Sequence, residues 1–183
     1  MAENGFTTEN YSLTTSDGYI LSLYRIPGTQ DNADMKKPAV LMMHCQDGDM
    51  MEWLWNSSDK AGALMLARAG YDVWLGNNRG SRYSNTHESL TTKDKAYWDY
   101  YQQDMAEKDL PTFIDHILEA TGSEKISYVG HSEGTTQMFL GASLQPDYFK
   151  EKINLFIALA PVANTATVSS PFAKLFAPYI NTL

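Results

Sequence analysis

A serine flanked by two glycines stands where a short apolar run meets a segment that can form a helix. The run Ile126–Val129 has the composition of a strand, and residues 136–143 place apolar side chains on one helical face, at Met138, Phe139 and Ala142. Gly130 and Gly134 allow strand and helix to approach closely, and the sharp turn raises the Ser132 hydroxyl above the sheet edge. Ser132 is therefore predicted to be a nucleophile in acyl transfer, the alternative being an ordinary turn with a solvent-facing serine.

The segments around this turn predict the elements that hold it. Residues 11–15 and 19–26 alternate polar and apolar side chains around Ser16-Asp17-Gly18 and predict a β-hairpin. The continuous apolar run Ala39–Met43 predicts a strand that is buried on both faces. Tyr71–Gly76 is predicted to be the next strand, and Ile153–Ala160 a further buried strand.

Helices are predicted between these strands. Apolar residues recur at helical spacing from 61 to 69, where Gly70 ends the pattern, and again from 104 to 121, where Gly122 follows. The alternation of strand and helix predicts the α/β class, with a mostly parallel sheet of about six strands, an antiparallel leading hairpin and helices on both faces.

The amino-acid composition and net charge exclude several classes of protein and of partner. A chain of 183 residues with 43% hydrophobic and 20% charged residues is expected to fold as one globular domain. Its formal net charge of -8 argues against nucleic acid or an anionic membrane as a partner, because both attract basic surfaces. The single cysteine excludes an internal disulfide. No run reaches the length of a membrane-spanning helix, and the polar start Met1–Gly5 does not resemble a signal peptide.

Several collinear stretches resemble the acid lipase family of the α/β-hydrolases, the family of gastric lipase and lysosomal acid lipase. They are Thr15–Leu21, Arg25–Pro27, Ala69–Gly80, Asp109–Pro111, Tyr128–Ser132 and Ala158–Val162. The block Tyr71–Gly80 is specific to that family rather than to the fold. The resemblance covers roughly residues 6–175 and implies hydrolysis of acylglycerols or sterol esters through an acyl-enzyme at Ser132, without a metal or other cofactor.

The resemblance also implies two donors for the oxyanion of the reaction. One is the backbone N–H of Glu133, directly after the nucleophile, and the other is the N–H of Gln46, in the loop after the strand at 39–43. Two residues depart from the family, since Cys45 stands where glycine is usual and Glu133 where the family has glutamine. A carboxylate at 133 would oppose the developing negative charge unless it is paired or points to solvent.

The sequence after Ser132 lacks the histidine base of a catalytic triad and a carboxylic acid at the expected place. In this fold they follow the serine, acid first and histidine second, whereas the histidines all precede Ser132, at His44, His87, His116 and His131. His131 adjoins the serine on the turn, where neighbouring side chains diverge, and the others are expected to be loop or packing residues. The later carboxylates are Glu133, Asp147 and Glu151, of which the last two are expected near the end of the helix after the serine.

The chain is therefore predicted to be the N-terminal half of a lipase. Residues 1–165 are expected to form a partial α/β-hydrolase core, and residues 166–183 the start of a cap region or a C-terminal tail. The missing groups would come from a C-terminal half or a partner chain, so that this chain is expected to be inactive alone. The resemblance implies a secreted or lysosomal location and a lipid ester substrate.

A second function of another class stays open. Cys45, Glu133 and the absent histidine are also consistent with a non-catalytic hydrolase-like module that acts in binding or assembly. Other patterns are expected to be structural: Asp47-Gly48-Asp49 is a turn rather than a calcium loop, and Cys45 beside His44 is a loop substitution rather than a thiol nucleophile. No metal site is expected.

Overall fold

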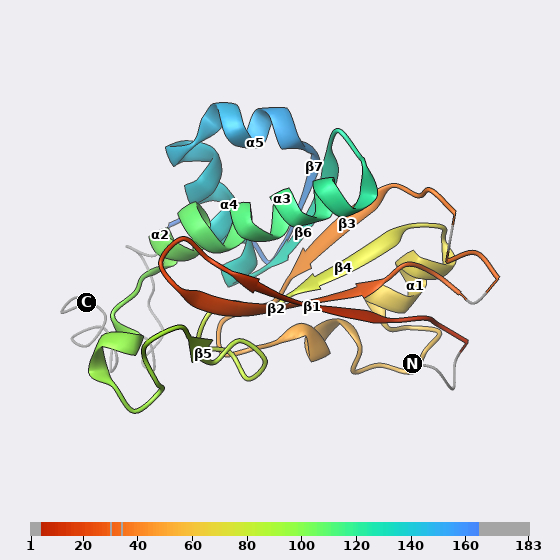
Figure 1. Ribbon diagram of the computed structural model, residues 1–183. Helices are drawn as coiled ribbons and strands as arrows, with labels where there is room; N and C mark the ends of the chain where they lie inside the picture. Colours follow the sequence, from red (N-terminus) through yellow and green to blue (C-terminus); the bar gives the residue numbers. More distant parts are fainter. Residues whose placement is uncertain (1–4, 30, 34, 165–183) are drawn as a thin grey trace.

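A single mixed β-sheet carries the fold (Figure 1). The structure, a computed structural model, describes residues 5–29, 31–33 and 35–164. In this part of the chain the sheet has seven strands in the order β1-β2-β4-β3-β6-β7, with the short β5 paired to β2. The strands are β1 (Glu9–Thr14), β2 (Tyr19–Ile26), β3 (Ala39–Met43), β4 (Asp72–Gly76), β5 (Thr86–His87), β6 (Ile126–His131) and β7 (Ile153–Leu159).

The direction of the strands confirms the predicted fold class. β1 and β2 form an antiparallel hairpin, and β2 pairs antiparallel with β4. β4, β3, β6 and β7 run parallel to one another. All predicted strands are present, whereas β5 was not predicted because it has only two residues within a long polar loop.

Helices cover both faces of the sheet, as predicted. α1 (Gly62–Arg68) lies on one face, and α3 (Leu110–Thr121) and α4 (Glu133–Leu144) lie on the other (Figure 1). Further helices are η2 (Met50–Trp53), η3 (Lys95–Trp98) and α5 (Pro146–Lys152). α5 was expected to continue the helix after the serine, but Gln145 has φ −131° and ψ 57° and Pro146 begins a new helix.

The predicted helix from 104 to 121 contains an irregular turn. It begins as α2 (Gln102–Asp104), passes through the π-helical turn η4 (Met105–Asp109) and continues as α3. Gly122 ends it in the left-handed conformation, with φ 61°, as the sequence predicted. The π-helical turn was not predicted, because the apolar spacing on either side of it reads as one helix.

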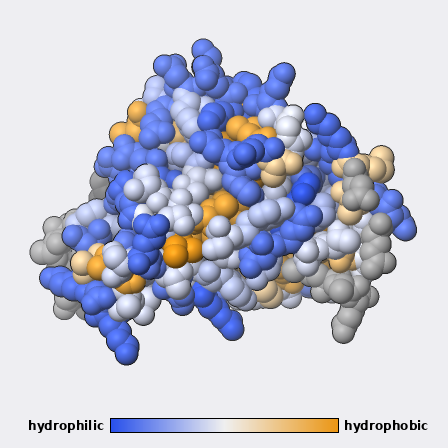
Figure 2. Space-filling model, viewed as in Figure 1, coloured by the Kyte–Doolittle hydropathy of each residue, from blue (hydrophilic) through white to orange (hydrophobic). Residues whose placement is uncertain are grey.

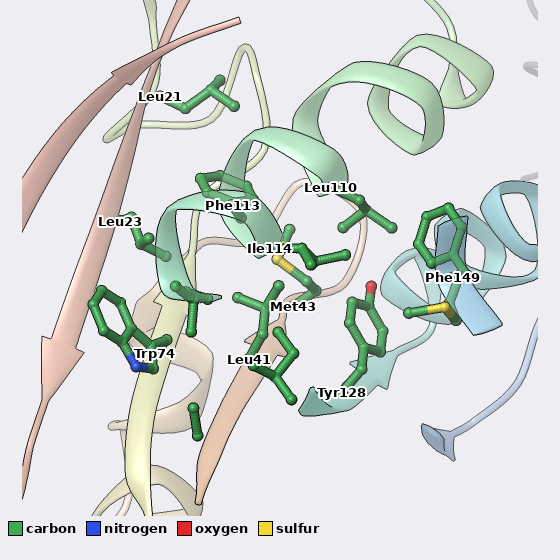
Figure 3. Close-up of a cluster of buried hydrophobic side chains, with 14 of the residues drawn as sticks. Leu21, Leu23, Leu41, Met43, Trp74, Leu110, Phe113, Ile114, Tyr128 and Phe149 are labelled. Atoms are coloured by element: carbon green, nitrogen blue, oxygen red, sulfur yellow. The ribbon is translucent and has the colours of Figure 1, made fainter. Parts of the chain in front are cut away.

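Two apolar clusters hold the layers together. The larger lies between the sheet and α3, where Leu41, Met43 and Trp74 meet Phe113 and Ile114 (Figure 3). The smaller lies on the opposite face, where Val40, Met42, Val73 and Leu75 pack against residues of α1. Every residue of β3 and β4 is buried, which confirms that these strands are covered on both faces.

β7 differs from the strands at the centre of the sheet, and the prediction that it is buried is wrong. Its side chains alternate between half-buried and exposed, and the exposed fractions of Leu155, Ile157 and Leu159 are 52%, 42% and 43%. The reason is its place at the end of the described sheet, next to β6 only. The face shown in Figure 2 is largely hydrophilic, with small apolar areas between charged side chains. Among the described helices, none is both long and apolar enough to cross a bilayer.

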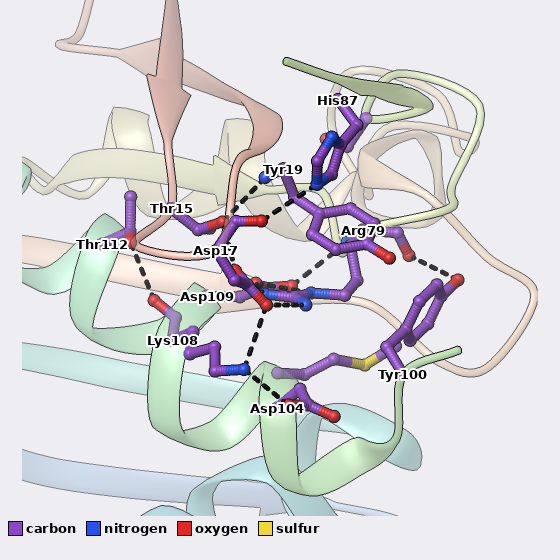
Figure 4. A network of polar contacts seen from close by, with 12 residues as sticks. Thr15, Asp17, Tyr19, Arg79, His87, Tyr100, Asp104, Lys108, Asp109 and Thr112 are labelled. Atoms are coloured by element: carbon purple, nitrogen blue, oxygen red, sulfur yellow. Dashed lines mark hydrogen bonds and ion pairs between the residues drawn. The ribbon is translucent and has the colours of Figure 1, made fainter. Parts of the chain in front are cut away.

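A buried ion network joins the hairpin turn, the loop after β4 and η4 (Figure 4). The Arg79 guanidinium group is fully buried, and its nitrogens contact Asp109 Oδ1 at 2.6 Å and Asp17 Oδ2 at 2.8 Å. It also lies over the ring of Tyr19, 4.1 Å from the centroid. Lys108 extends the network, with Nζ 3.0 Å from Asp17 Oδ2. Burial alone would raise the pKa of Asp17, but the hydrogen bonds from Arg79 and Lys108 hold that pKa well below its ordinary value.

Arg79→Met should destabilise the protein strongly. The substitution leaves the Asp109 carboxylate, whose side chain has no exposed surface, without its charge partner. The expected loss is about 3–5 kcal/mol in the free energy of unfolding, measured by urea denaturation. The exposed Arg82 offers a matched control, and Arg82→Met should change stability by less than about 0.5 kcal/mol. Equal effects of the two substitutions would contradict the role given to the network.

Candidate active site

Ser132 occupies a strained turn between β6 and α4. Its backbone has φ 51° and ψ −109°, in a region that residues with a Cβ rarely adopt. Hydrogen bonds on both sides of the turn hold it in place. The Ser132 N–H donates to the carbonyl of Leu159 at 3.0 Å, and the Ser132 carbonyl accepts from the Thr135 hydroxyl at 2.6 Å. The side chain of Ser132 is half-buried, at the carboxyl end of the parallel strands.

The two glycines beside Ser132 are required by close backbone contacts. A Cβ on Gly130 would lie 2.6 Å from the carbonyl group of Gly134, and a Cβ on Gly134 would lie 2.7 Å from the carbonyl oxygen of Met43. Neither neighbour is a flexible side-chain end, so a larger residue would displace backbone. The spacing of the glycines around Ser132 is therefore a requirement of this turn, as the sequence analysis expected.

The loop after β3 lies beside the turn. Cys45 Sγ, at its start, and a ring nitrogen of His131, the residue before Ser132, lie within 4.8 Å of each other. Gln46 follows in this loop and is exposed, and the Gly48 N–H donates to the Cys45 carbonyl at 3.1 Å. Glu133 begins α4, so its N–H has no acceptor within the helix. The geometry thus brings the loop of Gln46 and the first N–H of α4 to the same edge of the sheet.

The Glu133 side chain is half-buried and receives only neutral donors. Asn78 Nδ2 lies 3.5 Å from one carboxylate oxygen, and Gln102 Nε2 lies 3.3 Å from the other. Burial raises the pKa of Glu133, the hydrogen bonds from Gln102 and Asn78 lower it less, and the net direction is upward. The carboxylate is thus held by amides rather than turned to solvent, one of the two arrangements that the sequence analysis allowed.

Both ring nitrogens of His44 form hydrogen bonds with backbone groups, one in each of two loops. Its Nε2 accepts the N–H of Asn78 at 3.1 Å, so the proton of the neutral ring lies on Nδ1, which donates to the Cys45 carbonyl at 2.7 Å. Burial lowers the pKa of His44. Both ring nitrogens therefore serve to join the loops after β3 and β4, and neither is directed to Ser132.

The other histidines are also engaged away from the serine hydroxyl. His87 contacts the Asp17 carbonyl through Nε2 and accepts the Ser89 N–H through Nδ1. The ring of His116 packs against Tyr11, with centroids 4.6 Å apart. His131 Nδ1 is in close contact with Glu52 Oε1. The expectation that these histidines act in loops and packing agrees with these contacts.

The acidic turn and the thiol in the loop after β3 have structural surroundings. Asp49 caps η2 by accepting the Met51 N–H at 2.8 Å, which is the arrangement of a turn rather than of a calcium loop. Burial and the neighbouring Glu52 carboxylate raise the pKa of the Cys45 thiol to about 11. A thiol that stays protonated at neutral pH is a poor nucleophile.

Three site residues escaped the sequence analysis. Asn78 joins His44 to Glu133, Gln102 binds Glu133 from α2, and Glu52 accepts the Cys45 N–H at 2.7 Å. The stretch that contains Asn78 was singled out as family-specific, so a signal existed for that residue. Glu52 lies in the short helix η2 and Gln102 begins α2. Neither belongs to a pattern of distinctive spacing, so the sequence carries no such signal for them.

Glu133→Gln is expected to stabilise the protein at neutral pH. The raised pKa means that the folded state holds its proton above the ordinary value of 4.5, so ionisation at higher pH weakens the fold. The gain from Glu133→Gln should be absent below about pH 4 and grow as pH rises through the raised pKa. In addition, the introduced amide can donate to Asn78 Oδ1, a buried atom without a hydrogen-bond partner.

Urea denaturation of both proteins between about pH 4 and 8 measures this difference. Glu151→Gln, at an exposed position in α5, is the control and should leave the pH dependence unchanged. A constant difference between wild type and Glu133→Gln across the pH range would rule out the burial effect.

Comparison with known proteins agrees with this geometry. The family profile described as alpha/beta hydrolase fold matches residues 38–177, and that described as partial alpha/beta-hydrolase lipase region matches residues 1–57. Human lysosomal acid lipase/cholesteryl ester hydrolase and human lipase member K are each 43% identical over 93% of this chain. Mouse gastric triacylglycerol lipase is 42% identical over 93% of the chain. The chain spans 43–44% of the length of these three relatives.

Solved structures share the fold at low sequence identity. A candidate lipase of Sulfolobus solfataricus superposes with a TM-score of 0.67 and 19% identity, over 91% of this chain and 49% of the other. A candidate epoxide hydrolase of Pseudomonas aeruginosa gives a TM-score of 0.63 and 22% identity, over 96% of this chain and 49% of the other. These structures show the fold alone. The profile that matches residues 38–177, together with the 42–43% identity to lysosomal and gastric lipases, shows that the chain belongs to the acid lipase family of the α/β-hydrolases.

Proposed function

We propose that this chain carries the nucleophile of a serine ester hydrolase, with Ser132 forming an acyl-enzyme. The observation that supports this most directly is the backbone of Ser132, which is held at positive φ by two glycines that admit no side chain. Such strain persists only where the surrounding structure enforces it, and it is concentrated at functional sites. An ordinary turn between a strand and a helix has no need of it.

The oxyanion of the tetrahedral intermediate would be bound by two backbone N–H groups. The first is that of Glu133, which also lies at the positive end of the α4 dipole. The second is that of Gln46, which follows Cys45, whose Sγ lies within 4.8 Å of a ring nitrogen of His131, the residue before Ser132. The neutral partners of the Glu133 side chain limit the electrostatic penalty that this carboxylate would impose on a neighbouring oxyanion.

Acyl transfer also needs a proton acceptor for the serine hydroxyl. His44, His87, His116 and His131 are the histidines of the sequence, and the described contacts commit them to other groups. We therefore propose that the base and its acid come from further residues of a longer protein or from a partner chain. This chain by itself would then be inactive.

The substrate class follows from the relatives. Proteins named as triacylglycerol lipase and cholesteryl ester hydrolase share 42–43% identity with this chain, which supports a lipid ester substrate and a secreted or lysosomal location. The runner-up function is a non-catalytic hydrolase-like module, which Cys45 and Glu133 favour because both depart from the family pattern. Reactivity of Ser132 distinguishes the two functions.

A fluorophosphonate probe tests the nucleophile. If the proposal is correct, the probe should label Ser132 when the protein is combined with the segment or partner that supplies the base. Ser132→Ala should abolish the labelling, while Ser143→Ala, at an exposed position in α4, should leave it unchanged. Peptide mass spectrometry locates the label. Absence of label on Ser132 in every combination would favour the non-catalytic module.

The exposed row on β7 supports an interaction with a further polypeptide segment. Leu155, Ile157 and Leu159 are spaced by two residues and so project from one face of the strand. An edge strand with an apolar face readily associates with another chain. Without another segment, two copies of this chain would associate and bury these three side chains against each other.

Light scattering coupled to size-exclusion chromatography measures this association. The purified 183-residue chain should elute as an oligomer, and Leu155→Glu should shift it toward the monomer. Leu144→Glu places the same charge at a similarly exposed leucine of α4 and should not change the elution. A monomeric wild-type chain would contradict the association.

A further inference from the structure

Three side chains that can bind a metal ion meet beside Ser132. They are Cys45 from the loop after β3, Glu52 from η2 and His131 from the end of β6. Their ligand atoms all lie within 4.8 Å of one another, although His131 is far from the other two in sequence. No function described above uses this set.

Contacts already join the three residues of the cluster. Glu52 Oε2 accepts the Cys45 N–H at 2.7 Å, which fixes the carboxylate and leaves Oε1 directed at His131. His131 Nδ1 has almost no exposed surface and, despite its contact with Glu52 Oε1, has no hydrogen bond of acceptable geometry. Cys45 is a free cysteine. The imidazole nitrogen and the carboxylate oxygen therefore already face each other where an ion would bind.

Gly48 packs closely against the sulfur and the carboxylate of the cluster. A Cβ on Gly48 would lie 3.0 Å from Cys45 Sγ and 3.5 Å from Glu52 Oε2. Zinc–ligand bonds of about 2.0–2.3 Å in a tetrahedral arrangement separate the ligand atoms by about 3.3–3.6 Å. The cluster therefore needs only small side-chain movements to reach that geometry.

We propose that Cys45 Sγ, Glu52 Oε1 and His131 Nδ1 bind one zinc ion, with water or another small ligand in the fourth position. A thiolate, an imidazole and a carboxylate form a set that zinc binds, whereas calcium and magnesium require oxygen ligands. On binding, the Cys45 thiol releases its proton to solvent and its sulfur forms the bond to the ion. Glu52 Oε2 keeps its hydrogen bond to the Cys45 N–H and orients the carboxylate.

The position of the site suggests its effect. Cys45 adjoins Gln46 and His131 adjoins Ser132, so a bound ion would join the loop after β3 to the serine turn. It would thereby fix the distance between the two sides of the proposed oxyanion site. Zinc binding itself depends only on the three ligands, so it can fail or succeed independently of the reactivity of Ser132.

Cobalt(II) is a suitable probe, because its absorption reports both the coordination geometry and a bond to sulfur. The purified protein, stripped of metal with a chelator, should bind one equivalent of Co²⁺ and develop a thiolate-to-cobalt charge-transfer band. An equivalent of Zn²⁺ should displace the cobalt and remove the band. Competition with a zinc indicator then gives the zinc affinity.

Variants assign the ligands. Cys45→Gly should abolish the charge-transfer band, and Glu52→Gln and His131→Gln should each weaken zinc binding about 100-fold or more, since changes behind the ligands alone cost about 10- to 100-fold. Glu124→Gln, at an exposed carboxylate, should have no effect. Far-UV circular dichroism checks that each variant is folded. Cobalt binding without the charge-transfer band, or equal zinc affinity of folded Cys45→Gly and wild type, would overturn the site.

Discussion

The buried guanidinium group of Arg79 is the interaction on which the arrangement of the site depends. It binds Asp17 at the hairpin turn and Asp109 at the start of α3, and thereby holds the loop after β4 between them. The next residue back along the loop is Asn78, which joins His44 to Glu133. A buried charge needs such partners. The pairing of Arg79 with Asp17 and Asp109 therefore also positions the loop after β4 and, through Asn78 and His44, the loop after β3.

A second constraint is the contact between backbone segments at the serine turn. Gly134 lies against the carbonyl of Met43, so α4 approaches β3 more closely than any side chain would permit. This contact sets the height of the first turn of α4, and with it the N–H of Glu133, relative to the loop that follows β3. The position of one proposed oxyanion donor is thus a result of packing in the centre of the sheet.

The sequence predicted most of the architecture, because apolar periodicity and glycine positions report directly on strands, helices and sharp turns. Its predictions failed where the outcome depends on contacts between segments that are distant in sequence. β7 reads as a buried strand since its composition is apolar, but burial depends on the neighbours of a strand, which periodicity does not reveal. The expectation about Glu133 depended on partners far away in sequence, Asn78 and Gln102, and only the fold brings them together. The same holds for Cys45, Glu52 and His131. The roles of Ser132, Glu133 and Gln46 stay predictions.

The π-helical turn η4 reconciles two demands on one helical segment. Gln102, before the turn, contacts Glu133, and Asp109, at its end, contacts Arg79. A π-helical turn holds one residue more than an α-helical turn, and each residue of an α-helix rotates the chain by about 100°. Deletion of one residue from 105–109 would leave a regular helix. The side chains of Gln102 and Asp109 would then point in directions around the helix axis that could not meet Glu133 and Arg79 at the same time. Either the amide or the aspartate could then reach its target, so the insertion makes the ion network and the anchoring of α4 compatible.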